Sequence, residues 1–257
     1  MDKLHIVKIG GNIIENPKLL TPFLSNFAKI KESKILVHGG GKEATALANK
    51  IGIPVKIIEG RRITDKANLD LIIMLYAGKI NKKIVSLLQA SSCNALGISG
   101  ADANAYTAIR RPIKDTDYGF VGDLTKINNY FFKILIDLNI IPVCCAVSHD
   151  GNGQLLNTNA DTIAAKIASS LSANFKVILT YCFEKNGVLE NVHDEDSVIP
   201  LIDTKNYEEL KMNGIIAKGM LPKLHNCFEA LENGVQEIRI GNTEIFLGNN
   251  LFTKVKK

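Results

Sequence analysis

The chain has 257 residues, of which 46% are apolar and 22% are charged, with 20 Gly and only 7 Pro. This composition excludes a disordered polar tail, a collagen-like repeat and a small disulfide scaffold. No apolar run approaches the roughly 18 residues that a membrane span needs, and the first residues lack the apolar core of a signal peptide. We therefore expect a cytoplasmic protein that does not bind membranes.

The charge balance is mildly basic, with 31 Lys and Arg against 26 Asp and Glu. The lysines are scattered and often stand beside acids, whereas a nucleic-acid binder concentrates its positive charge in a stripe. We therefore expect no nucleic-acid partner. A small excess of positive charge suits a small anionic substrate, because a basic cleft concentrates anions.

The five cysteines do not form a metal or redox motif, because no pair has C-x-x-C spacing. Cys144 and Cys145 lie inside an apolar run and are expected to be small core residues of a buried strand. The sequence predicts no protein-bound metal site.

Strand and helix patterns alternate from the start of the chain. Residues 4–9 form a β-branched apolar run that is closed by Gly10-Gly11, and residues 34–38 form a second run that is closed by Gly39-Gly40-Gly41. A helix is expected between these runs, over residues 19–31. The later expected elements are helix 44–50, strand 55–59, helix 65–89 with Thr64 as its N-cap, strand 94–98, a hairpin within 110–127, helix 131–138, strand 140–147, helix 161–171, strand 176–180, helices near 207–212 and 220–233, and strand 237–240.

This alternation predicts an α/β fold with a mostly parallel central sheet sandwiched between helices. No linker or low-complexity tract divides the chain, so residues 1–257 are expected to form a single domain. Ligands of such sheets bind at the carboxyl ends of the strands. Both glycine turns fall at those ends.

Consecutive glycines that precede a helix can bind an anion through backbone N–H groups and the helix dipole. A single glycine pair would more simply permit a tight turn, but here the pattern occurs after each of the first two strands. Neither turn is a Walker A loop, since Lys42 is followed by Glu43. Neither has the G-x-G-x-x-G spacing of a dinucleotide-binding site, which disfavours a nicotinamide-dependent dehydrogenase.

Several charged residues stand at positions where they could act on an anion. Lys8 and Lys223 lie near a strand end and in the first turn of a helix, where each could neutralise phosphate charge. Arg62 could hold a carboxylate with two parallel hydrogen bonds. Asn157, Asn159 and Asp161 stand together at the start of a helix. We interpret the Asp161 carboxylate as a group that positions nearby lysines. The alternatives are an edge lysine that reaches water, an exposed loop arginine and a simple helix cap by Asn159.

Five motifs in this order resemble the N-acetylglutamate kinases, which are members of the amino acid kinase superfamily. The motifs are Lys8-Ile9-Gly10-Gly11-Asn12, His38-Gly39-Gly40-Gly41, Gly60-Arg61-Arg62-Ile63-Thr64, Asn157-Thr158-Asn159-Ala160-Asp161 and Gly219-Met220-Leu221-Pro222-Lys223. The resemblance covers essentially the whole chain, and the opening motif fits aspartokinases and uridylate kinases less well. It implies the amino acid kinase fold and ATP-dependent phosphorylation of the γ-carboxylate of N-acetyl-L-glutamate in arginine biosynthesis, with Mg²⁺ carried by the nucleotide.

The same resemblance implies roles for individual residues. Residues 1–172 would form a lobe for the acyl-glutamate and for dimerisation, and residues 173–257 a lobe for the nucleotide. Lys8 and Lys223 would stabilise charge on the transferred phosphoryl group, and Asp161 would position both lysines. The residues implied in substrate binding are Gly40, Gly41, Arg62 and Asn157, and those implied in nucleotide binding are Gly11, Tyr181, Gly187, Ile215 and Ala217.

The resemblance is weakest around residues 180–189, where this chain is longer than the family's usual adenine-pocket segment and lacks its aspartate. Two alternatives stand beside this interpretation: an N-succinylglutamate kinase of the same family, since some relatives use that acyl group, and a non-catalytic nucleotide-binding regulator that kept the fold. We expect a homodimer that pairs through the helix over 65–89. We also expect no inhibition by arginine, because inhibited members carry an extra helix ahead of the first strand.

Overall fold

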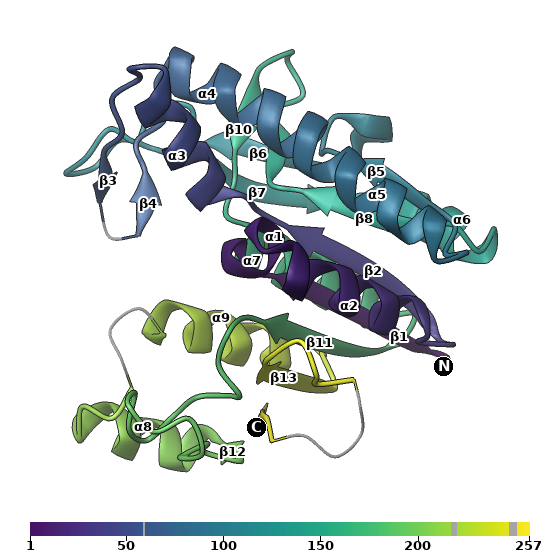
Figure 1. Ribbon diagram of the computed structural model, residues 1–257, viewed down its shortest axis with the longest axis vertical. Coiled ribbons are helices and arrows are strands. Elements are labelled where there is room, and N and C mark those ends of the chain that lie inside the picture. The colour runs from purple at the N-terminus through teal and green to yellow at the C-terminus, as the bar shows by residue number, and fades with distance from the viewer. Residues whose placement is uncertain (59, 217–219, 247–250) are drawn as a thin grey trace. The chain divides into compact units, whose positions relative to one another are not determined.

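The computed structural model describes residues 1–58, 60–216, 220–246 and 251–257 (Figure 1). Packing divides the chain into two compact units: the first contains Met1–Lys34 and Ala164–Lys257, and the second contains Ile35–Ile163. This division follows contacts and differs from the expected lobe boundary at residue 172. Which lobe binds which ligand therefore stays a prediction.

The first unit contains a mixed sheet whose strands run in the order β12-β14-β13-β11-β1. All neighbours are parallel except β13 and β14, which are antiparallel. The side chains of Leu4, Ile6 and Val7 in β1 are all fully buried, as expected for a strand that is covered on both faces. Its elements are β1 (Lys3–Ile9), α1 (Gly11–Glu15), α2 (Pro17–Ala28), β11 (Lys176–Cys182), β12 (Leu201–Ile202), α8 (Thr204–Met212), α9 (Leu221–Glu232), β13 (Glu237–Gly241) and β14 (Thr253–Val255).

The second unit contains the parallel strands β2-β8-β5, a four-stranded sheet in the order β10-β9-β6-β7 and the small antiparallel pair β3-β4. Helix α7 (Ala160–Leu171) starts in this unit and continues into the first. The other elements are β2 (Ser33–His38), α3 (Gly41–Lys50), β3 (Ile57–Ile58), β4 (Arg61–Arg62), α4 (Lys66–Ile73), a π-helical segment (Met74–Ile80), α5 (Asn81–Ala90), β5 (Ala95–Ile98), a 3₁₀ turn (Asp102–Asn104), β6 (Tyr106–Arg110), β7 (Gly122–Ile127), α6 (Asn129–Asp137), β8 (Ile141–Cys145), β9 (Val147–His149) and β10 (Leu155–Asn157).

The expected α/β class, with mostly parallel strands flanked by helices, is confirmed. An antiparallel pair is present, but it starts earlier than the expected range of 110–127, since β6 covers Tyr106–Arg110 and pairs with β7 up to Ile127. The short strands β9, β10, β12 and β14 were not expected from the sequence, because each has only two or three residues and carries little periodicity.

The helix expected over 65–89 is present as a continuous helical stretch from Lys66 to Ala90, with π geometry between α4 and α5. The expected N-cap, Thr64, is wrong. The N-cap of this helix is Asp65, whose carboxylate accepts from the Asn68 N–H at 2.8 Å. Thr64 is instead fully buried and bonded elsewhere.

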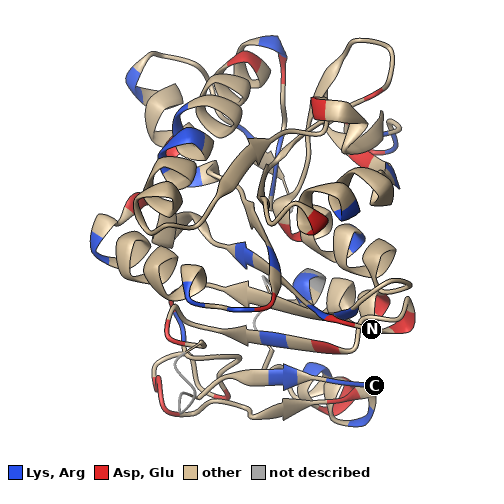
Figure 2. Cartoon of the chain, turned by 90° about the vertical axis from the view of Figure 1, so that its right-hand side faces the viewer, with Lys and Arg blue, Asp and Glu red and all other residues tan. Residues whose placement is uncertain are grey.

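Charged residues are spread over many helices, strands and loops (Figure 2). Within the part of the chain that the structure describes, no helix is long and apolar enough to cross a membrane.

Candidate active site

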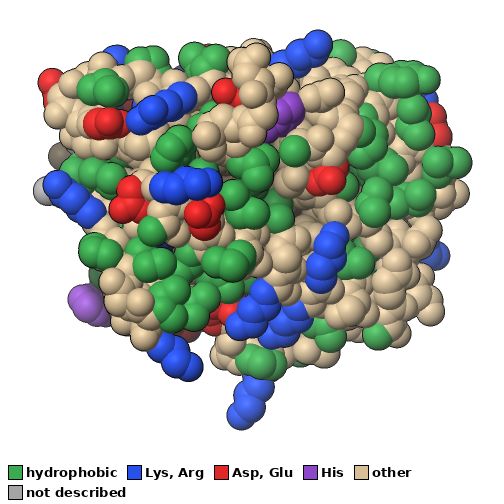
Figure 3. Space-filling model, turned by 90° about the horizontal axis from the view of Figure 1, so that it is seen from above, with side chains coloured by type: hydrophobic (Ala, Val, Ile, Leu, Met, Phe, Trp, Pro, Cys, Tyr) green, Lys and Arg blue, Asp and Glu red, His purple; other side chains and the backbone are tan. Residues whose placement is uncertain are grey.

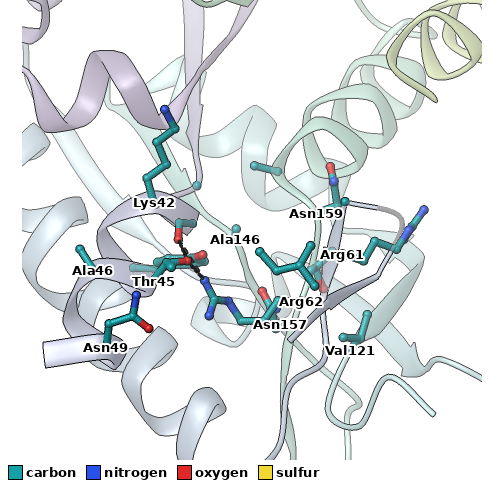
Figure 4. Close-up of a pocket in the computed structure, with 18 residues that line it drawn as sticks. Lys42, Thr45, Ala46, Asn49, Arg61, Arg62, Val121, Ala146, Asn157 and Asn159 are labelled. Carbon is teal, nitrogen blue, oxygen red and sulfur yellow. Dashed lines mark hydrogen bonds between the residues drawn. The ribbon is translucent and has the colours of Figure 1, made fainter. Parts of the chain in front are cut away.

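A cavity of about 590 Å³ lies in the second unit. It is bordered by the turn after β2, the start of α3, the β3-β4 pair and the chain that enters α7, and Figure 4 shows Arg62 between Thr45 and Asn157, with Lys42 and Arg61 extending outward. The lining residues include Gly39, Gly40, Gly41, Lys42, Thr45, Arg61, Arg62, Tyr76, Asn157 and Asn159.

The glycine turn Gly39–Gly41 joins the buried end of β2 to the first residue of α3. A Cβ on Gly40 would lie 2.4 Å from Ile80 Cδ1 and 2.9 Å from Tyr76 Cε1, so both side chains would have to shift to admit one there. The backbone N–H groups at the start of α3 have no acceptors within the helix, and the helix dipole makes this end partially positive. The turn therefore suits an anion.

Arg62 supplies a full positive charge to the same cavity, although its side chain is only 8% exposed. Its Nη2 donates to the Gly41 carbonyl at 3.0 Å and to Thr45 Oγ1 at 2.5 Å, and its Nη1 lies 3.4 Å from Asn68 Oδ1. These partners are all neutral, and no described carboxylate forms an ion pair with Arg62. A buried guanidinium without a counter-ion favours the binding of an anionic ligand.

The phenol of Tyr76 borders Arg62 and stays neutral. Burial raises the pKa of Tyr76 to about 12, and the nearby charge of Arg62 opposes this shift only in part. Lys42 extends away from Arg62 (Figure 4).

Thr64 connects Arg62 with Asn157, a relationship that the sequence did not reveal. The Thr64 hydroxyl donates to the Arg62 carbonyl at 3.0 Å and accepts from Asn157 Nδ2 at 2.9 Å. The structure thus brings together the two residues expected to bind the substrate α-carboxylate, and it holds both through one buried hydroxyl.

The expected polar cluster at the start of α7 is present. Asn159 Oδ1 accepts from the N–H groups of Asp161 at 2.7 Å and Thr162 at 3.1 Å, which confirms Asn159 as a cap. Asp161 is half-buried in the first turn. It belongs to the second unit and Lys8 and Lys223 to the first, so the positioning of these lysines by Asp161 stays a prediction.

In the first unit, Lys8 and Lys223 both adjoin Tyr181. Lys8 is paired with Tyr181 in the register of β1 and β11. The Lys223 Nζ lies 4.7 Å from the centre of the Tyr181 ring, which is only 1% exposed. The structure therefore places both predicted phosphoryl-binding lysines near the carboxyl ends of β1 and β11 in the first unit.

The first glycine turn, Gly10-Gly11, directly follows β1 and so lies at the same strand ends. The Gly10 N–H donates to the Cys182 carbonyl at 3.0 Å, and Gly11 is the first residue of α1. Asn12 Nδ2 donates to the Glu184 carboxylate, which ties α1 to the chain that leaves β11. This contact also has no signal in the sequence, because the two residues are far apart along the chain.

The remaining expected nucleotide residues are more scattered. Gly187 is packed so closely that a Cβ would lie 2.6 Å from Val198 Cγ1 and 2.7 Å from Thr253 Oγ1. Ile215 is half-buried just after α8. Ala217 lies outside the described residues.

Positive and negative side chains both occur on the face seen in Figure 3, among many apolar ones. Among the residues whose positions are described, no group of three or more His, Cys, Asp and Glu side chains is arranged to hold a metal ion.

Comparison with known proteins agrees with this geometry. Residues 3–242 match the model of the amino acid kinase family. An acetylglutamate kinase of Cytophaga hutchinsonii is 51% identical over 245 residues, covering 95% of this chain and 93% of that protein. An acetylglutamate kinase of Bacteroides thetaiotaomicron is 47% identical over 256 residues, covering 100% of this chain and 99% of that protein.

A solved structure of a Streptococcus mutans UA159 protein has the same fold, with a TM-score of 0.82 and 26% sequence identity, covering 98% of both chains. The family match over residues 3–242 and the relatives of about half-identical sequence lead to one conclusion. The chain belongs to the amino acid kinase family.

Proposed function

We propose that the protein is an acetylglutamate kinase, which transfers the γ-phosphoryl group of ATP to the γ-carboxylate of N-acetyl-L-glutamate in arginine biosynthesis. The observation that carries this proposal is the buried Arg62 guanidinium, which lines the cavity beside the glycine turn and whose partners among the described residues are all neutral. The names of the similar Cytophaga and Bacteroides enzymes support the same reaction.

In the proposed complex, Arg62 and Asn157 bind the substrate α-carboxylate. A guanidinium has five N–H donors, and the bonds of Arg62 to described residues leave donors for a carboxylate. The guanidinium of Arg62 is held by Gly41 and Thr45, and the Asn157 amide by Thr64, so the donors of both are oriented before the substrate arrives. Gly40 and Gly41 border the substrate and offer backbone N–H groups to its oxygens.

The chemical step needs charge stabilisation more than proton transfer. The nucleophile is a carboxylate that is already ionised at neutral pH, so no general base is required. Lys8 and Lys223 stabilise the negative charge on the transferred group, with the N–H of Gly11 nearby. Asp161 positions the two lysines.

ATP supplies the phosphoryl group and carries Mg²⁺ into the site. The proposed nucleotide-binding residues are Gly11, Tyr181, Gly187, Ile215 and Ala217. Tyr181 is buried beneath Lys223 and acts through that lysine. Packing against Thr253 already explains the glycine at position 187, so its role toward ATP rests on the family resemblance.

We further propose a cytoplasmic homodimer, with the acyl-glutamate held by residues 1–172 and the nucleotide by residues 173–257. The buried thiols of Cys144, Cys145 and Cys182 are free, as is typical of a reducing compartment. Met74, in the helix proposed to pair, is 61% exposed, which leaves an apolar side chain for a second copy. Sedimentation of the purified protein tests the dimer.

A coupled assay of ADP release tests the reaction. N-acetylglutamate and N-succinylglutamate are compared side by side, with Arg62→Ala as a control for the cavity. The proposal expects ADP release with N-acetylglutamate and little activity in the variant. Activity with N-succinylglutamate alone, or ATP binding without turnover, would overturn it.

A further inference from the structure

A buried histidine stands directly before the glycine turn of the cavity. His38 is the last residue of β2 and is fully buried. Its Nδ1 lies 2.9 Å from the Gly39 carbonyl oxygen, and its Nε2 lies 3.1 Å from Nδ2 of Asn81, the first residue of α5. The proposed mechanism gives neither His38 nor Asn81 a role.

The hydrogen-bond partners of Asn81 determine which ring nitrogen of His38 carries the proton. Asn81 Nδ2 also donates to the Val143 carbonyl at 2.9 Å, and a carbonyl can only accept. The atom that faces both Val143 and His38 is therefore the amide nitrogen, so Nε2 of His38 accepts. It follows that Nδ1 carries the hydrogen and donates to the Gly39 carbonyl.

This bond fixes one peptide plane of the cavity lining. In a trans peptide, the carbonyl of one residue and the N–H of the next point in opposite directions. Holding the Gly39 carbonyl against His38 therefore sets the direction of the Gly40 N–H. Glycine has no side chain to limit the rotation of this peptide, so another group must do so.

We propose that Asn81 selects the Nδ1–H tautomer of His38, and that His38 thereby holds the Gly40 N–H in the direction that receives the anionic ligand of the cavity. His38 is a positioning residue, because its bond is to the Gly39 carbonyl. The inference rests on the proposed function only for the identity of the ligand.

Two variants of His38 separate positioning from packing. In His38→Asn, the side-chain amide lies near the place of Nδ1 and still donates to the Gly39 carbonyl. In His38→Gln, the amide reaches the place of Nε2 and loses that bond. Both replace a buried ring with a smaller polar group, so both lower the melting temperature.

The two variants should differ in kcat, measured with N-acetylglutamate and ATP. His38→Gln should lower kcat roughly 10- to 100-fold, as a small misplacement of a reacting group does. His38→Asn should stay within about fivefold of the parent, with the KM for ATP unchanged in both variants. Equal losses of kcat in the two variants would assign His38 a purely structural role.

A spectroscopic measurement decides the question without turnover. ¹⁵N spectra of the parent protein should show a neutral His38 ring protonated at Nδ1, and the Gly40 amide resonance should move in His38→Gln but not in His38→Asn. Protonation at Nε2, or a Gly40 resonance that is the same in all three proteins, would overturn the inference. A parent protein that shows these signals but does not phosphorylate N-acetylglutamate would overturn only the proposed function.

Discussion

The Lys223 ammonium lies 4.7 Å above the ring of Tyr181, the residue that pairs with Lys8 across β1 and β11. One buried residue thus contacts Lys223 through its ring and pairs with Lys8 through its backbone. The face of an aromatic ring attracts a cation, by roughly 0.5 to 2 kcal/mol depending on desolvation. Tyr181 therefore helps to hold the charge of Lys223 beside the strand that carries Lys8.

Replacement of either lysine should impair the chemical step and leave the fold intact. Lys8→Ala or Lys223→Ala should lower kcat by roughly 10²- to 10³-fold, as the loss of one preorganised donor does. Steady-state kinetics measure the effect, and thermal unfolding supplies the control. A variant of either residue with nearly normal kcat would remove that residue from the mechanism.

The contact of Tyr181 with Lys223 predicts a difference between two substitutions. Tyr181→Phe retains the ring face and should keep kcat within about threefold of the parent. Tyr181→Leu removes the face, and kcat should fall about tenfold, since a cation–π contact of about 1.4 kcal/mol corresponds to that factor. In a Lys223→Ala background the two substitutions should give the same kcat. A difference that persists there would mean that Tyr181 acts independently of Lys223.

Arg62 should act on substrate binding more than on ATP binding. Lysine keeps the charge but loses the planar arrangement of donors, so Arg62→Lys should raise the KM for N-acetylglutamate about tenfold or more and change the KM for ATP little. Initial rates with each substrate varied in turn measure both constants. Equal increases in the two KM values would instead identify an arginine that supports the fold.

The hydroxyl of Thr64 offers a test of the link between Arg62 and Asn157. Thr64→Val has a similar shape but leaves the Arg62 carbonyl and the Asn157 amide without this partner. We expect a loss of about 1–3 kcal/mol in the free energy of unfolding and a higher KM for N-acetylglutamate. Thr64→Ser, which keeps the hydroxyl, is the matched control. If Thr64→Val keeps the KM of the parent, the hydroxyl bonds to Arg62 and Asn157 do not support substrate binding.

His38 should make the protein sensitive to acid. Burial lowers the pKa of His38 from 6.5 to about 4, so the folded state prefers the neutral ring. Its contribution to stability is complete above pH 6.5. As the pH falls toward 4, the unfolded chain takes up a proton that the folded chain refuses, and up to roughly 3 kcal/mol is lost.

Denaturant unfolding at pH 7 and at pH 4.5 measures this loss. The parent should lose more stability between the two pH values than His38→Asn does. His5, whose pKa burial also lowers, contributes to both proteins and cancels in the difference. The same pH dependence in both proteins would exclude His38 as the source.

The alternation of apolar strands and helices was sufficient to predict the α/β class, because β1, β2, β8 and β11 are buried on both faces and read as nearly continuous apolar runs. The glycine turns and Arg62 were recognised as candidate site residues because glycine runs and paired arginines are unusual at strand ends. The cavity that contains Gly40 and Arg62 follows this expectation.

The hydrogen bonds that hold the site residues in place could not be predicted from the sequence. Thr64 was expected to cap a helix, yet its hydroxyl joins Arg62 to Asn157, which is 93 positions further along the chain. His38 and Asn81 are 43 positions apart. Such pairs depend on tertiary packing, and local periodicity carries no information about them.

The π-helical segment Met74–Ile80 sets the rotational phase between the two helices that flank it. On its near side, Asn68 of α4 contacts Arg62; on its far side, Asn81 of α5 bonds to His38. Each residue of an α-helix turns the chain by about 100°, so deleting a single residue within the segment would swing Asn81 away while Asn68 stayed in place. The number of residues between Asn68 and Asn81 therefore determines whether both side chains can reach Arg62 and His38 at once. A deletion between Tyr76 and Asn81 would disconnect the glycine turn from its support while leaving Tyr76, which lines the cavity beside Arg62, on the near side of the deletion.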